Sequence, residues 1–207
     1  MMHEARGLGY HVDFVFIALD APAMHVLRVA DRVRKGGHDI PTDLVTARYA
    51  VSTGVRLGQG YDAADGFVLL NASAAGSFRL LVVAERGEAS YLGARFPEWA
   101  VRGMGERLER LRDRDRQGVA ERARKRLGDL GRTACAVAEG TVRGEVVAIG
   151  AGHVAFALSD DDDRLGLPAG SIAVVPAASP SELLLGRSML YAIDRVARSE
   201  EPSDRPL

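Results

Sequence analysis

Residues 11–41 read HVDFVFIALDAPAMHVLRVADRVRKGGHDIP, and this stretch decides the predicted fold. The apolar run at 11–19 is rich in β-branched and aromatic residues and has the length of a buried strand. Pro22 stands where a helix begins, apolar residues then recur at helical spacing, and the diglycine at 36–37 ends the helix. Pro41 opens a second helix. The order strand, helix, glycine turn, helix predicts an α/β fold.

The remainder of the chain predicts two further regions joined by a helix. Residues 66–71 form a second apolar strand, and residues 78–92 have the pattern of a hairpin that turns near Gly87. After Gly131, short apolar segments alternate with Gly, Asp and Pro turns, as in a small antiparallel sheet or barrel. The predicted divisions are an α/β domain at 1–105, a charged and solvated connector helix at 106–130, a β-domain at 131–198 and a disordered tail at 199–207.

The composition is that of a globular protein with a substantial core. Of the 207 residues, 47% are hydrophobic, and the formal net charge is −1. No run of roughly 18 apolar residues occurs, so we expect no membrane span, and we expect no secretory signal. Cys135 is the only cysteine, which favours a reducing cytoplasm. The arginine-rich run at 107–126 is interleaved with acidic residues and does not indicate nucleic-acid binding.

One basic constellation is a candidate for chemistry. The segment RVADRVRKGGHDIP at 28–41 carries arginines at a helix end, then a diglycine and His38, and Arg48 follows on the next helix. Arginine suits phosphate binding because its planar fork offers paired hydrogen bonds, and glycines allow a loop to close over a ligand. Arg32, Arg48 and His38 are therefore the candidate binding residues, as a hinged basic clamp.

These residues resemble the zeta-toxin-like group of P-loop kinases, which belong to toxin–antitoxin systems. The resemblance covers about residues 5–100 and depends on Ala18-Leu19-Asp20-Ala21-Pro22, RVADRVRKGGHDIP, Ala47-Arg48-Tyr49 and Ser52. It implies a P-loop kinase fold, ATP with Mg²⁺ as the phosphate donor, and a nucleotide-sugar precursor of the cell wall as acceptor. It also implies that residues 36–48 belong to a lid over ATP, with Arg32 and Arg48 contacting phosphate.

The sequence departs from that family in three respects. The resemblance implies a catalytic acidic residue that activates the acceptor hydroxyl, and we expect this residue to be absent from the chain, together with the phosphate-binding motif. The phosphate-binding motif GxxxxGK[ST], whose amides and lysine hold the phosphates, is absent from the 207 residues. The family's Asp-Asn-Ser appears as Asn71-Ala72-Ser73, which puts base recognition in doubt. We therefore expect a truncated kinase segment that is inactive alone, with no catalytic residue, no metal site and no cofactor in the isolated chain.

Two other interpretations stay open. The chain could be half of a split kinase that a P-loop-bearing chain completes, or a non-catalytic interaction protein of plasmid maintenance. In the family fold the phosphate-loop strand neighbours the strand that corresponds to residues 11–19. The resemblance thus implies an uncovered strand edge, which predicts a homodimer through residues 11–19 or a strand accepted from a P-loop-bearing partner.

The C-terminal region has a resemblance of its own. Residues 138–195, with GTVRGEVVAIGAGHVAFAL and GRSMLYAI, are similar to the KfrB-type domain of plasmid proteins. We expect His153 to be a hydrogen-bonded structural histidine and the acidic run at 160–163 to be a solvated turn. We also expect a fragment that starts near Gly131 to fold alone.

Overall fold

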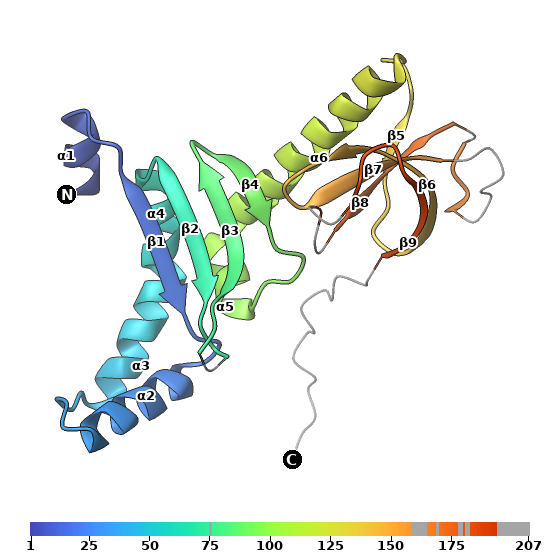
Figure 1. Ribbon diagram of the computed structural model, residues 1–207. Coiled ribbons are helices and arrows are strands. Elements are labelled where there is room, and N and C mark those ends of the chain that lie inside the picture. The colour runs from blue at the N-terminus through green and yellow to red at the C-terminus, as the bar shows by residue number, and fades with distance from the viewer. Residues whose placement is uncertain (75, 159–164, 169, 178–179, 181–182, 194–207) are drawn as a thin grey trace, which may run out of the picture. The chain divides into compact units, whose positions relative to one another are not determined.

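The computed structural model describes residues 1–74, 76–158, 165–168, 170–177, 180 and 183–193. It is an α/β structure with two sheets, as predicted. The chain divides into two compact units, Met1–Tyr91 with Phe96–Leu111 and Leu92–Arg95 with Arg112–Leu207 (Figure 1). The acidic run at 160–163 and the predicted disordered tail at 199–207 lie outside the described residues.

The first unit contains a four-stranded sheet in the order β1-β2-β3-β4. Its strands are β1 (Asp13–Ala18), β2 (Gly66–Asn71), β3 (Arg79–Glu85) and β4 (Glu88–Leu92). Strands β1 and β2 are parallel, whereas β3 runs antiparallel to β2. The predicted hairpin is confirmed, because Arg86 and Gly87 join β3 to β4 with φ angles of 49° and 79°. Two positive φ angles are the signature of a type I′ hairpin turn.

Six helical segments accompany this sheet. They are α1 (Met2–Gly7), α2 (Pro22–Arg34), α3 (Thr42–Val51), the π-helix η1 (Ser52–Arg56), α4 (Leu57–Ala63) and α5 (Glu98–Met104). Both helix starts predicted from proline are confirmed, since Pro22 is the first residue of α2 and Pro41 caps α3.

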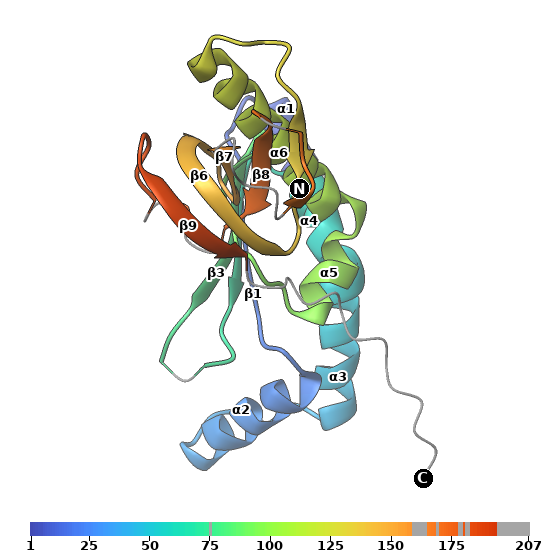
Figure 2. The same ribbon diagram turned by 90° about the vertical axis from the view of Figure 1, so that its right-hand side faces the viewer.

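Helices α3, α4 and α5 lie along one face of the sheet (Figure 2). The ring centroid of Phe16 on β1 lies 6.0 Å from that of Trp99 on α5, and Tyr61 on α4 meets Phe67 on β2 edge to face at 5.0 Å. Figure 2 shows α3, α4 and α5 along one side of these strands. On the opposite face, Val15 and Ile17 remain 54% and 49% exposed. The sheet of this unit is therefore buried on one side only.

The second unit contains a five-stranded sheet in the order β5-β8-β7-β6-β9. Its strands are β5 (Ala134–Ala136), β6 (Gly140–Ile149), β7 (His153–Leu158), β8 (Ile172–Pro176) and β9 (Ser188–Ile193). The strands expected in this region, β6 to β9, pair antiparallel as predicted, whereas β5, which was not predicted, pairs with β8 in parallel. Strands β6 and β7 lie between β5 and β8 in the sequence, so no hairpin joins β5 to β8 and forces them to run antiparallel.

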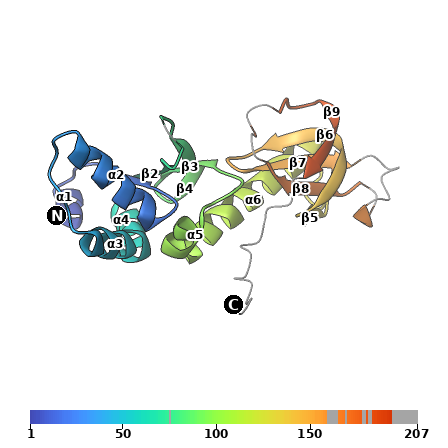
Figure 3. The same ribbon diagram turned by 90° about the horizontal axis from the view of Figure 1, so that it is seen from below.

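The helix α6 (Glu106–Leu127) also differs from expectation. It is charged, but it is not solvated all round, because Val119, Ala120 and Ala123 are buried against Val147, Ala155, Ile172 and Val174 of the sheet. Figure 3 shows this half of α6 beside the strands of the second unit. These buried residues form a narrow stripe that consists partly of alanine. The charged residues around it dominate the sequence pattern, so the stripe was not predicted. The unit boundary falls inside α6, after Leu111.

One buried carboxylate ties α6 to the β6–β7 turn. Asp115 accepts hydrogen bonds from the N–H groups of Ala151 (2.8 Å) and Gly152 (2.9 Å), and its Oδ2 lies 2.9 Å from Nδ1 of His153. The Asp115 side chain is only 7% exposed. Burial raises the pKa of Asp115, but the hydrogen bonds from His153, Ala151 and Gly152 outweigh it, so the pKa is lowered overall. His153 is thus a satisfied structural histidine, as expected.

The packing of α6 changes the expectation for isolated fragments. A fragment that begins at Arg112 keeps the buried stripe of α6 and should unfold cooperatively. A fragment that begins at Gly131 exposes Val147, Ala155, Ile172 and Val174 and should be unfolded or aggregated, because their apolar surface loses its cover. Circular dichroism and the dispersion of amide proton shifts measure the difference. Equal folding of the two fragments would show that α6 contributes no stability to the second unit.

Replacing Asp115 by Asn should destabilise the second unit by about 2 kcal/mol, because a buried acceptor of several hydrogen bonds becomes a poorer partner. Because the folded pKa of Asp115 is lowered, its stabilisation is fully present above the unfolded value of about 3.9 and is lost as pH falls through the folded pKa. The urea-denaturation midpoint of the unchanged protein should therefore fall at acidic pH. In Asp115→Asn this fall should be smaller. The control Asp113→Asn, at an exposed ion pair with Arg116, should change stability by less than about 0.5 kcal/mol.

Candidate functional site

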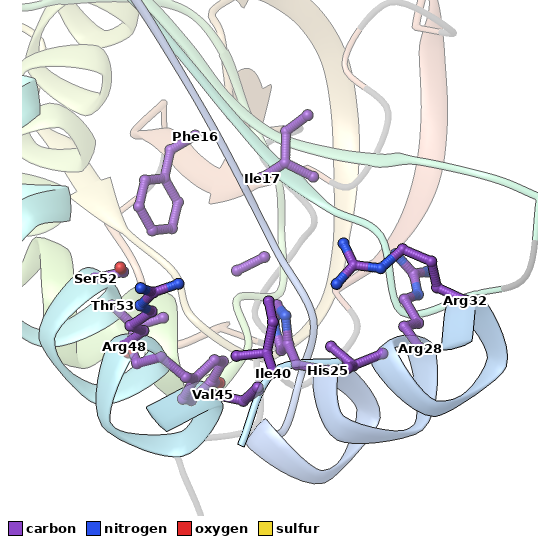
Figure 4. Close-up of a pocket in the computed structure, with 13 residues that line it drawn as sticks. Phe16, Ile17, His25, Arg28, Arg32, Ile40, Val45, Arg48, Ser52 and Thr53 are labelled. Atoms are coloured by element: carbon purple, nitrogen blue, oxygen red, sulfur yellow. The ribbon is translucent and has the colours of Figure 1, made fainter. Parts of the chain in front are cut away.

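A pocket of about 490 Å³ lies in the first unit at the carboxyl end of β1, between α2 and α3 (Figure 4). Phe16, Ile17 and Ala18 of β1 form one wall, and residues of α2, α3, η1 and the loop at Ile40 form the others. The carboxyl ends of strands are where open parallel sheets bind ligands, because the connections diverge there. The position alone makes this pocket the candidate site.

Three arginines line the pocket and give it its chemistry. Arg28 and Arg32 lie one turn apart on α2, and Arg48 approaches from α3 on the other side (Figure 4). None of the described residues that line the pocket is acidic. The three guanidinium charges are thus not neutralised by the pocket wall, and the site is suited to an anion with several negative oxygens.

The three guanidinium groups differ in how they are held. Arg28 donates a hydrogen bond from Nη2 to the carbonyl of Ala72 (2.6 Å), and Arg32 donates one from Nη2 to the carbonyl of His38 (3.0 Å). Within the described part of the chain, no hydrogen bond or ion pair holds Arg48. Two arginines are therefore pre-positioned by backbone carbonyls, while the third is available for a ligand.

The diglycine explains how Arg32 reaches its position. Gly36 has a φ angle of 88°, which ends α2 in a left-handed residue, and the N–H of Gly37 returns to the carbonyl of Arg32 (3.0 Å). A Cβ atom on Gly37 would lie only 2.6 Å from Cγ of Arg32. The first glycine thus supplies the turn, and the second leaves room for the arginine side chain.

Only some of the predicted site residues line the pocket. Arg32 and Arg48 are brought together in the pocket, whereas the His38 side chain is not part of its lining and only its carbonyl takes part. Sequence reasoning did not select Arg28 or His25 as site residues. The available signal was spacing, because His25, Arg28 and Arg32 follow one another at three and four residues, on one face of a helix.

His25 and Tyr49 form the aromatic corner of the pocket, with ring centroids 5.2 Å apart. Burial lowers the pKa of His25, and the charge of Arg28 lowers it further, so both effects disfavour the protonated imidazole. Burial raises the pKa of Tyr49, which keeps its hydroxyl a donor. That hydroxyl lies 3.2 Å from the carbonyl of Leu19 and 3.1 Å from that of Asp20, and it fixes α3 to the end of β1.

The π-helix η1 brings Ser52 and Thr53 to the pocket. Single π-turns inserted in α-helices are frequent at functional sites, since the extra residue redirects the helix face. Thr53 is 1% exposed, and its Oγ1 donates to the carbonyl of Tyr49 (2.9 Å). Gly103 of α5 packs against the carbonyl of Thr53, where any Cβ atom would come within 2.0 Å. The geometry of η1 therefore depends on a glycine in another helix.

Asn71-Ala72-Ser73 forms a closed polar network at the carboxyl ends of β1 and β2. The Asn71 amide donates to the carboxylate of Asp20 and accepts from the N–H of Ser73 (2.8 Å), while the N–H of Asp20 donates to Oγ of Ser73 (2.7 Å). Because these side chains are hydrogen-bonded to one another, their role in the structure is to join the carboxyl ends of β1 and β2.

The described residues offer neither a metal cluster nor a membrane-spanning helix. They contain no group of three or more His, Cys, Asp or Glu side chains that could hold a metal ion. None of their helices has the length and the apolar character needed to cross a membrane.

No family model, no curated protein and no solved structure matches this chain. The pocket must therefore be interpreted from its own residues.

Replacing Gly103 by Ala should disturb both the fold and the pocket. The new methyl group would collide with the Thr53 carbonyl, and overpacking of this kind costs about 1–3 kcal/mol. Thermal unfolding measures the loss, and NMR shifts of Arg48 and Thr53 report the pocket. The matched control is Gly54→Ala in η1, where a Cβ atom would meet nothing within 4 Å. A Gly103→Ala protein as stable as this control would contradict the close contact.

Proposed function

We propose that the first unit is the arginine-bearing segment of a zeta-toxin-like, ATP-dependent kinase, and that its pocket binds the phosphate groups of a nucleotide. The observation that carries the proposal is the convergence of Arg28, Arg32 and Arg48 on one pocket without an acidic residue in its described lining. A surface arginine without a binding role normally pairs with a carboxylate or extends into water. Three arginines that face one cavity from two helices instead favour an anionic ligand.

The arrangement favours a polyphosphate over a single phosphate. Arg48 stands on one side of the pocket, and Arg28 and Arg32 stand on the other (Figure 4). A chain of phosphates can contact both sides at once, and each guanidinium can form paired hydrogen bonds with phosphate oxygens. Phe16, Ile17 and Val45 supply apolar contact between the two cationic ends.

The same proposal holds that the chain is not an active kinase by itself. The sequence contains no GxxxxGK[ST] motif, which in P-loop kinases provides the amide cradle and the lysine for the phosphates. Without that cradle, the arginines hold a nucleotide weakly and do not position it for transfer. We also infer a reducing compartment, the cytoplasm, from the single free cysteine, Cys135.

The second candidate function is that of a split kinase completed by a P-loop-bearing chain. It is favoured by the position of β1, which is an outer strand of its sheet and also a wall of the pocket. A further strand added parallel to β1 would end at the pocket and could supply the missing amide donors there.

Isothermal titration calorimetry and NMR titration with ATP, tripolyphosphate and inorganic phosphate test the proposal. We expect a Kd of about 1 mM for ATP and tripolyphosphate, weaker binding of inorganic phosphate, and no ATP hydrolysis. Arg48→Ala should remove most of the affinity, and Arg32→Ala should reduce it. The control Arg34→Ala removes a charge on α2 outside the pocket and should leave binding unchanged.

Two results would contradict this function. Equal losses in Arg48→Ala and Arg34→Ala would mean that the binding is unspecific attraction between charges. Micromolar binding of Mg-ATP to the isolated chain would mean that the arginine pocket needs no phosphate loop, and that the chain is not an incomplete site.

A further inference from the structure

The described lining of the arginine pocket contains one imidazole, that of His25 (Figure 4). Arg28 and Arg32 follow His25 on the same face of α2. Within the described part of the chain, Nε2 of His25 is buried without a hydrogen-bond partner, and the side chain forms no ion pair. The charge of this imidazole is therefore not fixed by a partner, and its surroundings decide it.

The charged groups that line the pocket with His25 oppose its protonation. Its own helix brings Arg28 and Arg32, and α3 brings Arg48. Tyr49 of α3 packs against the imidazole as a neutral phenol, since burial raises its pKa. The remaining lining residues, from β1, α2, α3, η1 and the loop before α3, carry no ionisable side chain. Every charged group in the described lining is thus positive.

The carboxylates nearby do not compensate these charges. Asp20 and Glu98 act electrostatically on Tyr49, but neither lines the pocket. Asp20 accepts a hydrogen bond from the Asn71 amide, and Glu98 pairs with Arg102 at 3.4 Å. The negative charge that would favour a protonated His25 must therefore come from a ligand.

A bound anion reverses the balance at His25. Burial and the charge of Arg28 lower the pKa of His25 below its ordinary value of 6.5. A polyphosphate offsets the charge of Arg28, and its oxygens accept hydrogen bonds from an imidazolium, in which both ring nitrogens are donors. Both changes favour the charged form, so the pKa of His25 should be higher with the anion bound than without it.

We propose that an anion with several ionised oxygens binds this pocket together with a proton, which His25 takes up. This inference rests on the proposed function, since it concerns the same pocket and the same class of ligand, and it adds that the site responds to pH. Coupling between two ligands is reciprocal, so the factor by which the anion strengthens proton binding is also the factor by which the proton strengthens anion binding.

The direction of the pH dependence follows from the two pKa values of His25. Above both values the imidazole is neutral with and without the anion, so the affinity does not depend on its titration. Between them, binding takes up a proton, and the affinity rises as the pH falls. Below the pKa of the unliganded pocket, which lies under 6.5, the imidazole is charged in both states and the gain in affinity is complete.

An NMR titration of the histidine ring protons, with and without trimetaphosphate, tests the coupling directly. This cyclic triphosphate has no terminal phosphate group that titrates near pH 6, so proton uptake on binding belongs to the protein. We expect saturating trimetaphosphate to raise the pKa of His25. His153, which is bonded to Asp115 in the second unit, is the internal control and should titrate alike in both samples.

The affinity for trimetaphosphate at different pH values is the second measurement. The Kd should fall about tenfold between pH 8 and pH 5 in the unchanged protein. It should change little in His25→Gln, which keeps a polar side chain but does not titrate, whereas Arg34→Ala, outside the pocket, should keep the full pH dependence. Circular dichroism shows that both variants are folded.

The outcomes separate this inference from the proposed function. A pKa of His25 that trimetaphosphate does not raise, or an equal pH dependence in His25→Gln and the unchanged protein, overturns the proton coupling. The NMR titration gives this answer on the unchanged protein even where His25→Gln does not fold. If binding is lost in Arg48→Ala but is not coupled to His25, the anion pocket stands and only the coupling fails. If trimetaphosphate does not bind at all, the proposed function fails, and this inference fails with it.

Discussion

The parallel pairing of β1 with β2 is the constraint on which the first unit depends. Two parallel neighbours cannot be joined by a tight turn, so the chain must leave the sheet and return to its starting end. Here that crossover contains α2, α3, η1 and α4. Because the crossover begins at the carboxyl end of β1, α2 and α3 meet there, and the pocket forms between them. The basic site is thus a consequence of strand direction, with the arginines supplied by the sequence of the crossover.

Within that crossover, the backbone does most of the positioning. Arg28 and Arg32 are held by carbonyl groups, Tyr49 ties α3 to the chain after β1, and two glycines shape the turn between the helices. Carbonyl partners hold a guanidinium without neutralising its charge, whereas a carboxylate partner would compete with a bound anion. The second unit shows the contrasting case, in which a charge is satisfied within the protein. The buried carboxylate of Asp115 accepts several hydrogen bonds and thereby holds a helix to a turn.

Most of the first unit could be predicted from the sequence, because its signals are local. Strand composition, proline at helix starts and glycine at a helix end each act within a few residues. These signals predict β1 to β3, α2 and α3 with bounds close to the observed ones. Arg32 and Arg48 were found for the same reason, next to the diglycine. Arg28 and His25 were missed because their role depends on where α2 lies relative to β1. The buried stripe of α6 and the parallel direction of β5 depend on contacts between distant segments, which short patterns do not record.

Three guanidinium groups that line one pocket also have a cost in the folded state. Like charges that converge without a counter-ion repel one another, and dissolved anions relieve that repulsion when they enter. With an anion bound as proposed, folding and binding become linked, and a concentration of ten times Kd adds about 1.4 kcal/mol to the free energy of unfolding. The choice of buffer is then part of the thermodynamic state of this protein. Melting curves recorded in phosphate and in Tris describe two different equilibria.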